Sequence, residues 1–317
     1  MSKLKLPIII SNWKSNPKNL LEAKTILQKL DKEFTSLQKK DKKKKSIDLL
    51  LAVPSPFIYP IQTFLKEKRN SKLKNILIGA QNFDNTERSD VNNSISLTQL
   101  KSVGTQFVIL NDSDIISENE NLKFIPEKKE EKSSNRFDAN RLLMERLNGS
   151  SIKIEEVKQE SKSKETTKSN PLIIKKLEKL EEKIRATLEN GVIAIFFIKE
   201  DNLDNFKNIS EIIKKTIKNI HYNLFDKLII CYEPSREFFK VEQTDMEDCL
   251  EKTIAIRRSI ANMFGIDSAK KVKILYSGKI NENNVKEILK NGGVDGIFIN
   301  EESISPEVLA KVIYTAK

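Results

Sequence analysis

Eight short apolar segments recur along the chain, and each is followed by a stretch whose apolar residues have helical spacing. This alternation constrains the fold most, because short strands that alternate with helices form parallel sheets with the helices outside. The predicted strands are residues 7–10, 47–53, 76–80, 107–110, 192–198, 228–233, 272–276 and 295–299. Eight such units predict a closed (β/α)8 barrel of the α/β class. An open, doubly wound sheet is the alternative, and it is less favoured because no glycine-rich phosphate turn follows an early strand.

The alternation is interrupted once, between about residues 116 and 170. This segment is rich in Lys, Glu, Ser and Asn, and within it residues 137–147 have helical spacing. Most of it is too polar to bury much surface. We therefore predict a single barrel domain over residues 1–317, interrupted by a charged and mobile insertion after the fourth strand.

The charge of the chain points to no specific partner. The formal net charge is +11, which bears on solubility and on weak attraction of anions rather than on the fold. The densest basic run, residues 39–45, is interpreted as a solvated loop. Few aromatic residues lie near it, so nucleic acid is not an expected partner. No apolar run reaches the length of a membrane span, so we expect a cytoplasmic protein without a membrane partner.

Two cysteines and one histidine limit the chemistry available to the chain. Cys231 lies inside a predicted strand and is interpreted as a small core residue. The spacing of Cys231 and Cys249 fits no metal site, and we expect neither a metal nor a cofactor. His221 precedes the sixth strand, at the end away from a barrel's site, and is interpreted as a surface residue.

The sixth predicted strand contains the most informative candidate residue. Residues 228–232 lead to Glu233, and Pro234 ends the run. Ligands of α/β folds bind at the carboxyl ends of the strands, which is where Glu233 would lie. Glu233 is therefore either a working base or the remnant of one.

Short motifs at five of the predicted strands resemble those of triosephosphate isomerases. The motifs are Asn12-Trp13-Lys14, Ala80-Gln81-Asn82, Tyr232-Glu233-Pro234, Ile274-Leu275-Tyr276 with Gly278, and Asp295-Gly296. They occur in the family's order, each at the expected strand, and the resemblance covers the whole chain except the insertion. It implies a TIM barrel that interconverts dihydroxyacetone phosphate and glyceraldehyde 3-phosphate, a family that is itself the standard example of such a site.

The resemblance also implies roles for individual residues. Glu233 corresponds to the base that takes a proton beside the carbonyl, and Lys14 to the lysine that balances charge. Asn12, Lys14 and Gly278 correspond to substrate-binding positions. The implied ligand is a small phosphorylated sugar, and the implied assembly is a homodimer. The insertion offers a further surface for a protein partner.

Other positions depart from the family's pattern. Asp112 stands where the family has its electrophilic histidine, so it enters the candidate site in that role. The lid, residues 235–241, contains no glycine, and Asn300-Glu301 replaces a glycine pair after the eighth strand. A carboxylate at Glu301 would repel a phosphate by about 4 kcal/mol for unit charges about 4 Å apart at an effective dielectric constant of about 20.

Three functions remain open. The first, which these departures favour, is a catalytically impaired family member that acts by binding or as a partner subunit, with Glu233 bonded to Lys14 or Arg236. The second is a working isomerase of glycolysis and gluconeogenesis in which a protonated Asp112 replaces the histidine. The third is a barrel retuned to an unphosphorylated or cationic carbonyl compound, which Glu301 would favour.

Overall fold

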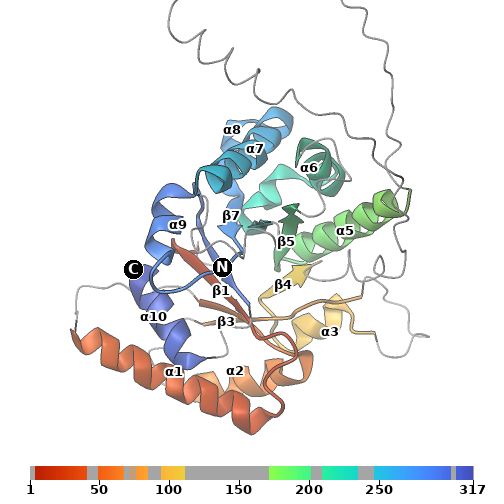
Figure 1. The fold of residues 1–317 in the computed structure, drawn as a ribbon. Coiled ribbons are helices and arrows are strands. Elements are labelled where there is room, and N and C mark those ends of the chain that lie inside the picture. Colours follow the sequence, from red (N-terminus) through yellow and green to blue (C-terminus); the bar gives the residue numbers. More distant parts are fainter. Residues whose placement is uncertain are drawn as a thin grey trace, which may run out of the picture. The chain divides into compact units, whose positions relative to one another are not determined.

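The computed structural model describes residues 4–40, 49–67, 73, 76–84, 94–110, 171–200, 209–234, 246–300 and 305–316 (Figure 1). The predicted insertion, Asp112, the lid residues 235–241 and Glu301 lie outside the described residues.

Within the described residues, eight strands form one parallel sheet. They are β1 (Ile8–Asn12), β2 (Leu49–Ala52), β3 (Leu77–Gly79), β4 (Phe107–Leu110), β5 (Ile193–Lys199), β6 (Leu228–Glu233), β7 (Lys273–Tyr276) and β8 (Gly296–Ile299). The order is β3-β2-β1-β8-β7-β6-β5-β4. A parallel bridge between Ala80 and Val108 joins the two ends of the sheet, β3 and β4. The predicted (β/α)8 barrel is therefore confirmed, and the open sheet is wrong.

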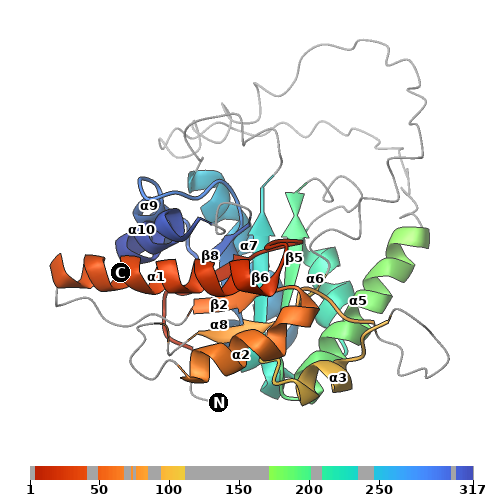
Figure 2. The same cartoon turned by 90° about the horizontal axis from the view of Figure 1, so that it is seen from below.

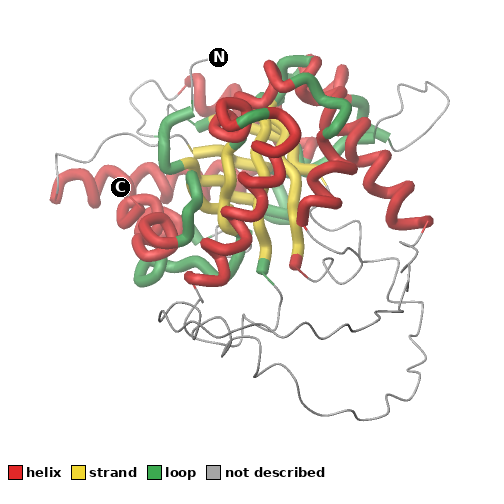
Figure 3. Tube along the Cα trace, turned by 90° about the horizontal axis from the view of Figure 1, so that it is seen from above, coloured by secondary structure: helices red, strands yellow, loops and turns green. Residues whose placement is uncertain are grey.

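The helices lie around the outside of the strands (Figures 2 and 3). Their bounds are α1 (Leu20–Lys40), α2 (Ile58–Glu67), α3 (Leu97–Ser102), α5 (Pro171–Glu189), α6 (Ile209–Ile217), α7 (Met246–Phe264), α8 (Ile266–Lys271), α9 (Val285–Asn291) and α10 (Pro306–Ala316). Two 3-10 turns, Ser55–Phe57 and Tyr222–Lys227, precede α2 and β6. The first and last helices, α1 and α10, pack against each other. No helix in the described ranges is long and apolar enough to cross a membrane.

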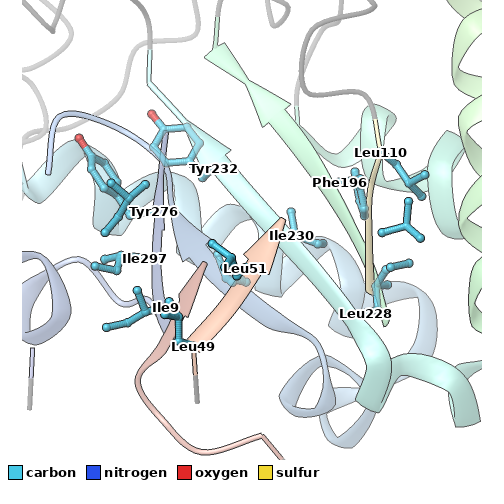
Figure 4. Packing of buried hydrophobic residues seen from close by; sticks show 14 of the residues in the cluster. Ile9, Leu49, Leu51, Leu110, Phe196, Leu228, Ile230, Tyr232, Tyr276 and Ile297 are labelled. Carbon is cyan, nitrogen blue, oxygen red and sulfur yellow. The ribbon is translucent and has the colours of Figure 1, made fainter. Parts of the chain in front are cut away.

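Strand residues alternate between two hydrophobic clusters, as the two-residue period of a strand requires. One cluster faces the helices and includes Ile9, Leu51 and Ile230, which Figure 4 shows on their strands. The other contains strand side chains alone and fills the barrel interior; its buried members are Ile8, Ile10, Leu50, Ala52, Phe107, Ile109, Ile193, Ile195, Phe197, Ile229, Cys231, Leu275 and Phe298. Cys231 is thus a buried core residue, as predicted, and His221 is exposed, also as predicted.

The Asp295-Gly296 motif joins three elements where β8 begins. Asp295 Oδ2 lies 2.7 Å from Arg257 Nη2 of α7 and accepts a hydrogen bond from the Ile274 N–H at 2.9 Å. At the next position, a Cβ on Gly296 would collide with the backbone of Ile8 on β1. This motif therefore serves the packing of β8 against its neighbours, at the opposite end of the barrel from Glu233.

Candidate functional site

The interior faces of several strands end in polar side chains at the carboxyl end of the barrel. Ile8 and Ile10 are followed on the same face by Asn12, and Ile229 and Cys231 by Glu233. By the same period of two, Lys199 follows Phe197 and Ser277 follows Leu275. We call this set the mouth; it consists of Asn12, Gln81, Lys199, Glu233 and Ser277, with Lys14 and Gly278 in the adjoining loops.

Hydrogen bonds bring the motifs after β1 and β3 together. Asn12 is buried, and its Oδ1 accepts hydrogen bonds from the Lys14 N–H at 3.0 Å and from Gln81 Nε2 at 3.0 Å. Gln81 Nε2 also donates to the Lys14 carbonyl oxygen at 2.7 Å. These contacts hold the Lys14 backbone at a φ of 50°, in the left-handed region that side-chain-bearing residues rarely adopt. Lys14 is thereby kept in a strained conformation beside the mouth while its side chain is exposed.

Glu233 forms an ion pair with Lys199. The two residues are register partners on the parallel strands β5 and β6. Lys199 Nζ lies 3.4 Å from Glu233 Oε1, and the two side chains are 14% and 18% exposed. From the sequence we expected Lys14 or Arg236 as the partner of Glu233. The structure describes a pair with Lys199, which the sequence did not predict. Arg236 lies outside the described residues, and the expected pairing with Lys14 stays a prediction.

Lys199 belongs to none of the motifs, so the resemblance did not point to it. A signal was nevertheless present in the sequence. Ile193, Ile195 and Phe197 alternate along the fifth strand, and Lys199 continues the same face at its carboxyl end. The two-residue period alone therefore places the lysine in the mouth.

The surroundings of the ion pair are partly polar and partly apolar. Ser277 Oγ donates to Glu233 Oε2 at 3.5 Å, and the Ser277 N–H donates to the Tyr232 carbonyl at 2.8 Å. Lys199 Nζ lies 5.5 Å from the centroid of the Phe197 ring. That ring meets Phe298 edge to face, with centroids 4.9 Å apart. The Lys199 ammonium thus lies over an aromatic ring at the carboxyl end of the barrel interior, where its attraction to Glu233 is stronger than in bulk water.

Two tyrosines stand behind the mouth, on the faces of β6 and β7 that turn toward the helices. Tyr232 and Tyr276 are register partners, and Figure 4 shows their phenol oxygens pointing the same way, toward the carboxyl ends of the strands. Burial, followed by the charges of Glu200 and Asp248, raises the pKa of the Tyr232 phenol above its ordinary value. Tyr232 therefore stays neutral and acts as a packing residue.

Gly278 lies against Tyr276. A Cβ at Gly278 would collide with the Tyr276 phenol ring and its oxygen. This position needs glycine for packing, whether or not it also contacts a ligand. Of the residues predicted as site residues, Asn12 and Lys14 are joined by a hydrogen bond. Glu233 ends β6, Gly278 follows the adjacent strand β7, and Asp112 lies outside the described residues.

Comparison with known proteins supports the resemblance. A family model described as triosephosphate isomerase matches residues 7–138 and 172–316. A triosephosphate isomerase of Lawsonia intracellularis is 27% identical over 312 residues, covering 97% of each chain. Those of Dictyoglomus turgidum and Aquifex aeolicus are 28% and 31% identical over 40% and 44% of this chain. The matches span about half of these two relatives, 53% and 57% of their lengths. Together with the eight-stranded parallel barrel, the match over most of the chain shows that this protein belongs to the triosephosphate isomerase family.

Proposed function

We propose that this chain is a catalytically impaired triosephosphate isomerase homologue that binds a ligand at its mouth. The observation that carries the proposal is the ion pair between Lys199 Nζ and Glu233 Oε1, at 3.4 Å. Glu233 corresponds to the family's base, and a base must be able to take a proton from the substrate.

The ion pair opposes that proton transfer. When Glu233 accepts a proton, it loses its charge and with it the attraction to the Lys199 ammonium. Both side chains are less than a fifth exposed, so water screens the attraction only in part. The loss is on the order of 2–4 kcal/mol at an effective dielectric constant of about 20. Each ~1.4 kcal/mol added to a barrier slows a reaction about tenfold, so the pair alone lowers the rate by roughly 30- to 1,000-fold.

A second feature acts in the same direction. Asp112 stands at the position of the family's electrophilic histidine. Loss of one preorganised electrophilic group costs about 3 kcal/mol in comparable sites. The two effects fall on different parts of the reaction, since one weakens the base and the other weakens stabilisation of the developing oxyanion.

A working isomerase of glycolysis and gluconeogenesis is the alternative. It is favoured by the hydrogen bonds that join Asn12, Lys14 and Gln81, because they hold the lysine position in a strained, preorganised backbone. In this alternative Glu233 takes the proton, Lys14 balances the charge of the enediolate, and a protonated Asp112 donates to its oxygen.

A coupled assay with purified full-length protein distinguishes these functions. The impaired homologue predicts turnover of dihydroxyacetone phosphate close to the uncatalysed rate, unchanged by Glu233→Gln. Lys252→Met is the matched control, because Lys252 also pairs with carboxylates, Glu200 and Asp248 at 3.7 Å, but on α7 rather than in the mouth. Robust turnover that Glu233→Gln abolishes and Lys252→Met leaves intact would establish the working isomerase instead.

Ligand, assembly and location complete the proposal. The mouth is proposed to take a small phosphorylated sugar, in a cytoplasmic homodimer. Calorimetry with a phosphate-bearing enediolate mimic tests the ligand: we expect weak binding, because Glu301 repels the phosphate, and no binding at all would contradict this ligand class. Light scattering on the purified protein tests the dimer.

A further inference from the structure

We infer that Lys199 captures small carbonyl compounds covalently, as an imine, with Glu233 relaying a proton from nitrogen to oxygen. The ligand class is a two- or three-carbon ketone or aldehyde. The inference uses the same ion pair as the proposed function, but it requires neither the loss nor the retention of isomerase activity.

The position of Lys199 provides what an amine nucleophile needs. The residue ends a strand rather than lying in a loop, so its backbone is held by the β5–β6 register. Its Nζ lies 3.4 Å from a carboxylate oxygen that can relay a proton from nitrogen to oxygen at the reacting carbon. Lys199 Nζ lies over the face of the Phe197 ring, which itself packs edge to face against Phe298, so the surroundings on this side are apolar.

Exposure distinguishes Lys199 from the other lysines with described carboxylate partners. Its side chain is 14% exposed, compared with 25% for Lys252, 57% for Lys311 and 74% for Lys270. Lys199 is therefore the most desolvated of these four, and it alone of them lies on the interior face of a strand at the mouth. Partial desolvation in apolar surroundings is a usual setting of lysines that react with carbonyl groups.

The reaction balances without an oxidant or reductant. Solvent water takes one proton from the Lys199 ammonium, and the amine lone pair attacks the carbonyl carbon. A C–N bond forms while the C=O π electrons move to oxygen, which takes that proton back from water to give a carbinolamine. Glu233 then moves a second proton from nitrogen to the hydroxyl group, water leaves, and a protonated C=N bond forms. In sum, an ammonium and a carbonyl compound give an iminium and water.

Borohydride trapping tests this inference. Full-length protein is incubated with dihydroxyacetone phosphate, or separately with dihydroxyacetone, and then reduced so that any imine becomes a stable secondary amine. Peptide mass spectrometry is expected to find the adduct on Lys199 with at least one probe and to find Lys252 unmodified. Labelling by dihydroxyacetone alone would assign the site to unphosphorylated ligands, whereas labelling by both would show that the phosphate is tolerated.

Two variants sharpen the test. Lys199→Arg keeps a cation beside Glu233 but cannot form an imine, so the adduct on that peptide is expected to be lost while the thermal midpoint is retained. Glu233→Gln removes the proton carrier and is expected to slow adduct formation on the order of a hundredfold.

Specific results would overturn the inference. The inference is wrong if no adduct forms on Lys199 with either probe, or if labelling of Lys199 is no greater than that of Lys252. Both results are measured on the wild-type protein, so they count even where Lys199→Arg fails to fold. An unchanged rate in Glu233→Gln would remove Glu233 from the chemistry. The coupled assay tests the proposed function on protein that has not been treated with borohydride. Turnover in that assay would contradict catalytic impairment and would not bear on the adduct at Lys199.

Discussion

Lys199 Nζ and Glu233 Oε1 lie 3.4 Å apart at the carboxyl ends of two neighbouring strands, with both side chains largely withdrawn from water. The contact places a cation on the carboxylate that corresponds to the family's base. Under the proposed function, this contact weakens the base while the family motif is retained. The pair also has a consequence for stability, because each charge is withdrawn from water beside its partner.

Breaking the pair from one side is expected to destabilise the protein. Lys199→Met leaves a mostly buried carboxylate, so the free energy of unfolding should fall by about 1–3 kcal/mol. The double variant Lys199→Met/Glu233→Gln removes the uncompensated charge as well and should recover at least half of that loss. Urea unfolding of the wild type, both single variants and the double variant gives the coupling energy. Additive effects would show that the two charges do not interact.

The ion pair at the amino end of the barrel is expected to contribute more than an exposed pair. Asp295→Asn weakens the 2.7 Å contact with Arg257 and the hydrogen bond from the Ile274 N–H, so unfolding should become easier by about 1.5–3 kcal/mol. Glu282→Gln is the matched control, since Glu282 and Lys311 are 3.2 Å apart but 41% and 57% exposed. Its effect should stay within about 0.5 kcal/mol. Equal effects in the two variants would mean that burial does not strengthen the Asp295 pair.

Gly278 is expected to be required for packing. Gly278→Ala would force a Cβ into the Tyr276 phenol, and such overpacking costs about 1–3 kcal/mol of stability. Replacing Tyr276 by leucine should reduce the cost of Gly278→Ala, because it removes the colliding ring. Gly265→Ala is a control with strained backbone, φ 84°, but no atom within 4 Å of the new Cβ. If Gly278→Ala costs the same with or without the Tyr276 ring, the collision is not the cause.

Replacing Lys14 by glycine is expected to relieve backbone strain. Glycine tolerates a φ of 50° without a steric penalty, and that relief offsets the greater flexibility glycine gives the unfolded chain. Lys14→Gly should therefore change the free energy of unfolding by less than about 0.5 kcal/mol, or raise it. Lys279→Gly, at an exposed lysine with an ordinary φ, should lower it by about 0.5–1 kcal/mol. Thermal melts of the two variants provide the comparison, and a larger loss at Lys14 would argue against stored strain.

The two cysteines are expected to resist thiol reagents while the protein is folded. Burial, followed by the charge of Asp248, raises the pKa of the Cys249 thiol from 9.0 to about 12. The folded protein thus keeps this thiol protonated, and the associated stability is present below pH 9 and is lost as the pH rises toward 12. Since the thiolate is the reactive form, labelling by a disulfide reagent at pH 8 should be slow in buffer and complete in urea. Rapid labelling of the folded protein would show that Cys249 is not buried.

The fold could be read from the sequence because its signals are local. The apolar runs and helical spacings predicted the order of strands and helices, and the apolar run around Cys231 predicted that it is a core residue. The short motifs added the family, because their order along the chain matches the order of strand ends. His221 was placed correctly for the same reason, since its position before β6 puts it at the amino end of the barrel.

The site could be read only in part. Asn12, Lys14 and Gln81 belong to motifs, yet their hydrogen bonds form only because the barrel brings the carboxyl ends of β1 and β3 together. Lys199 belongs to no motif, and its partner is 34 positions further along the chain. The roles of Gly278 and Gly296 also differ from what the motifs alone suggest, because each makes room for a neighbouring residue in space.

The sequence by itself therefore determined the barrel, the family and the order of strands and helices, because these follow from period, length and order along the chain. Only the tertiary structure showed that Lys199 forms an ion pair with Glu233. This pairing depends on the register between β5 and β6, which places Lys199 beside Glu233 and over the Phe197 ring. Register arises from the packing of the whole barrel, and no local pattern in either strand encodes it.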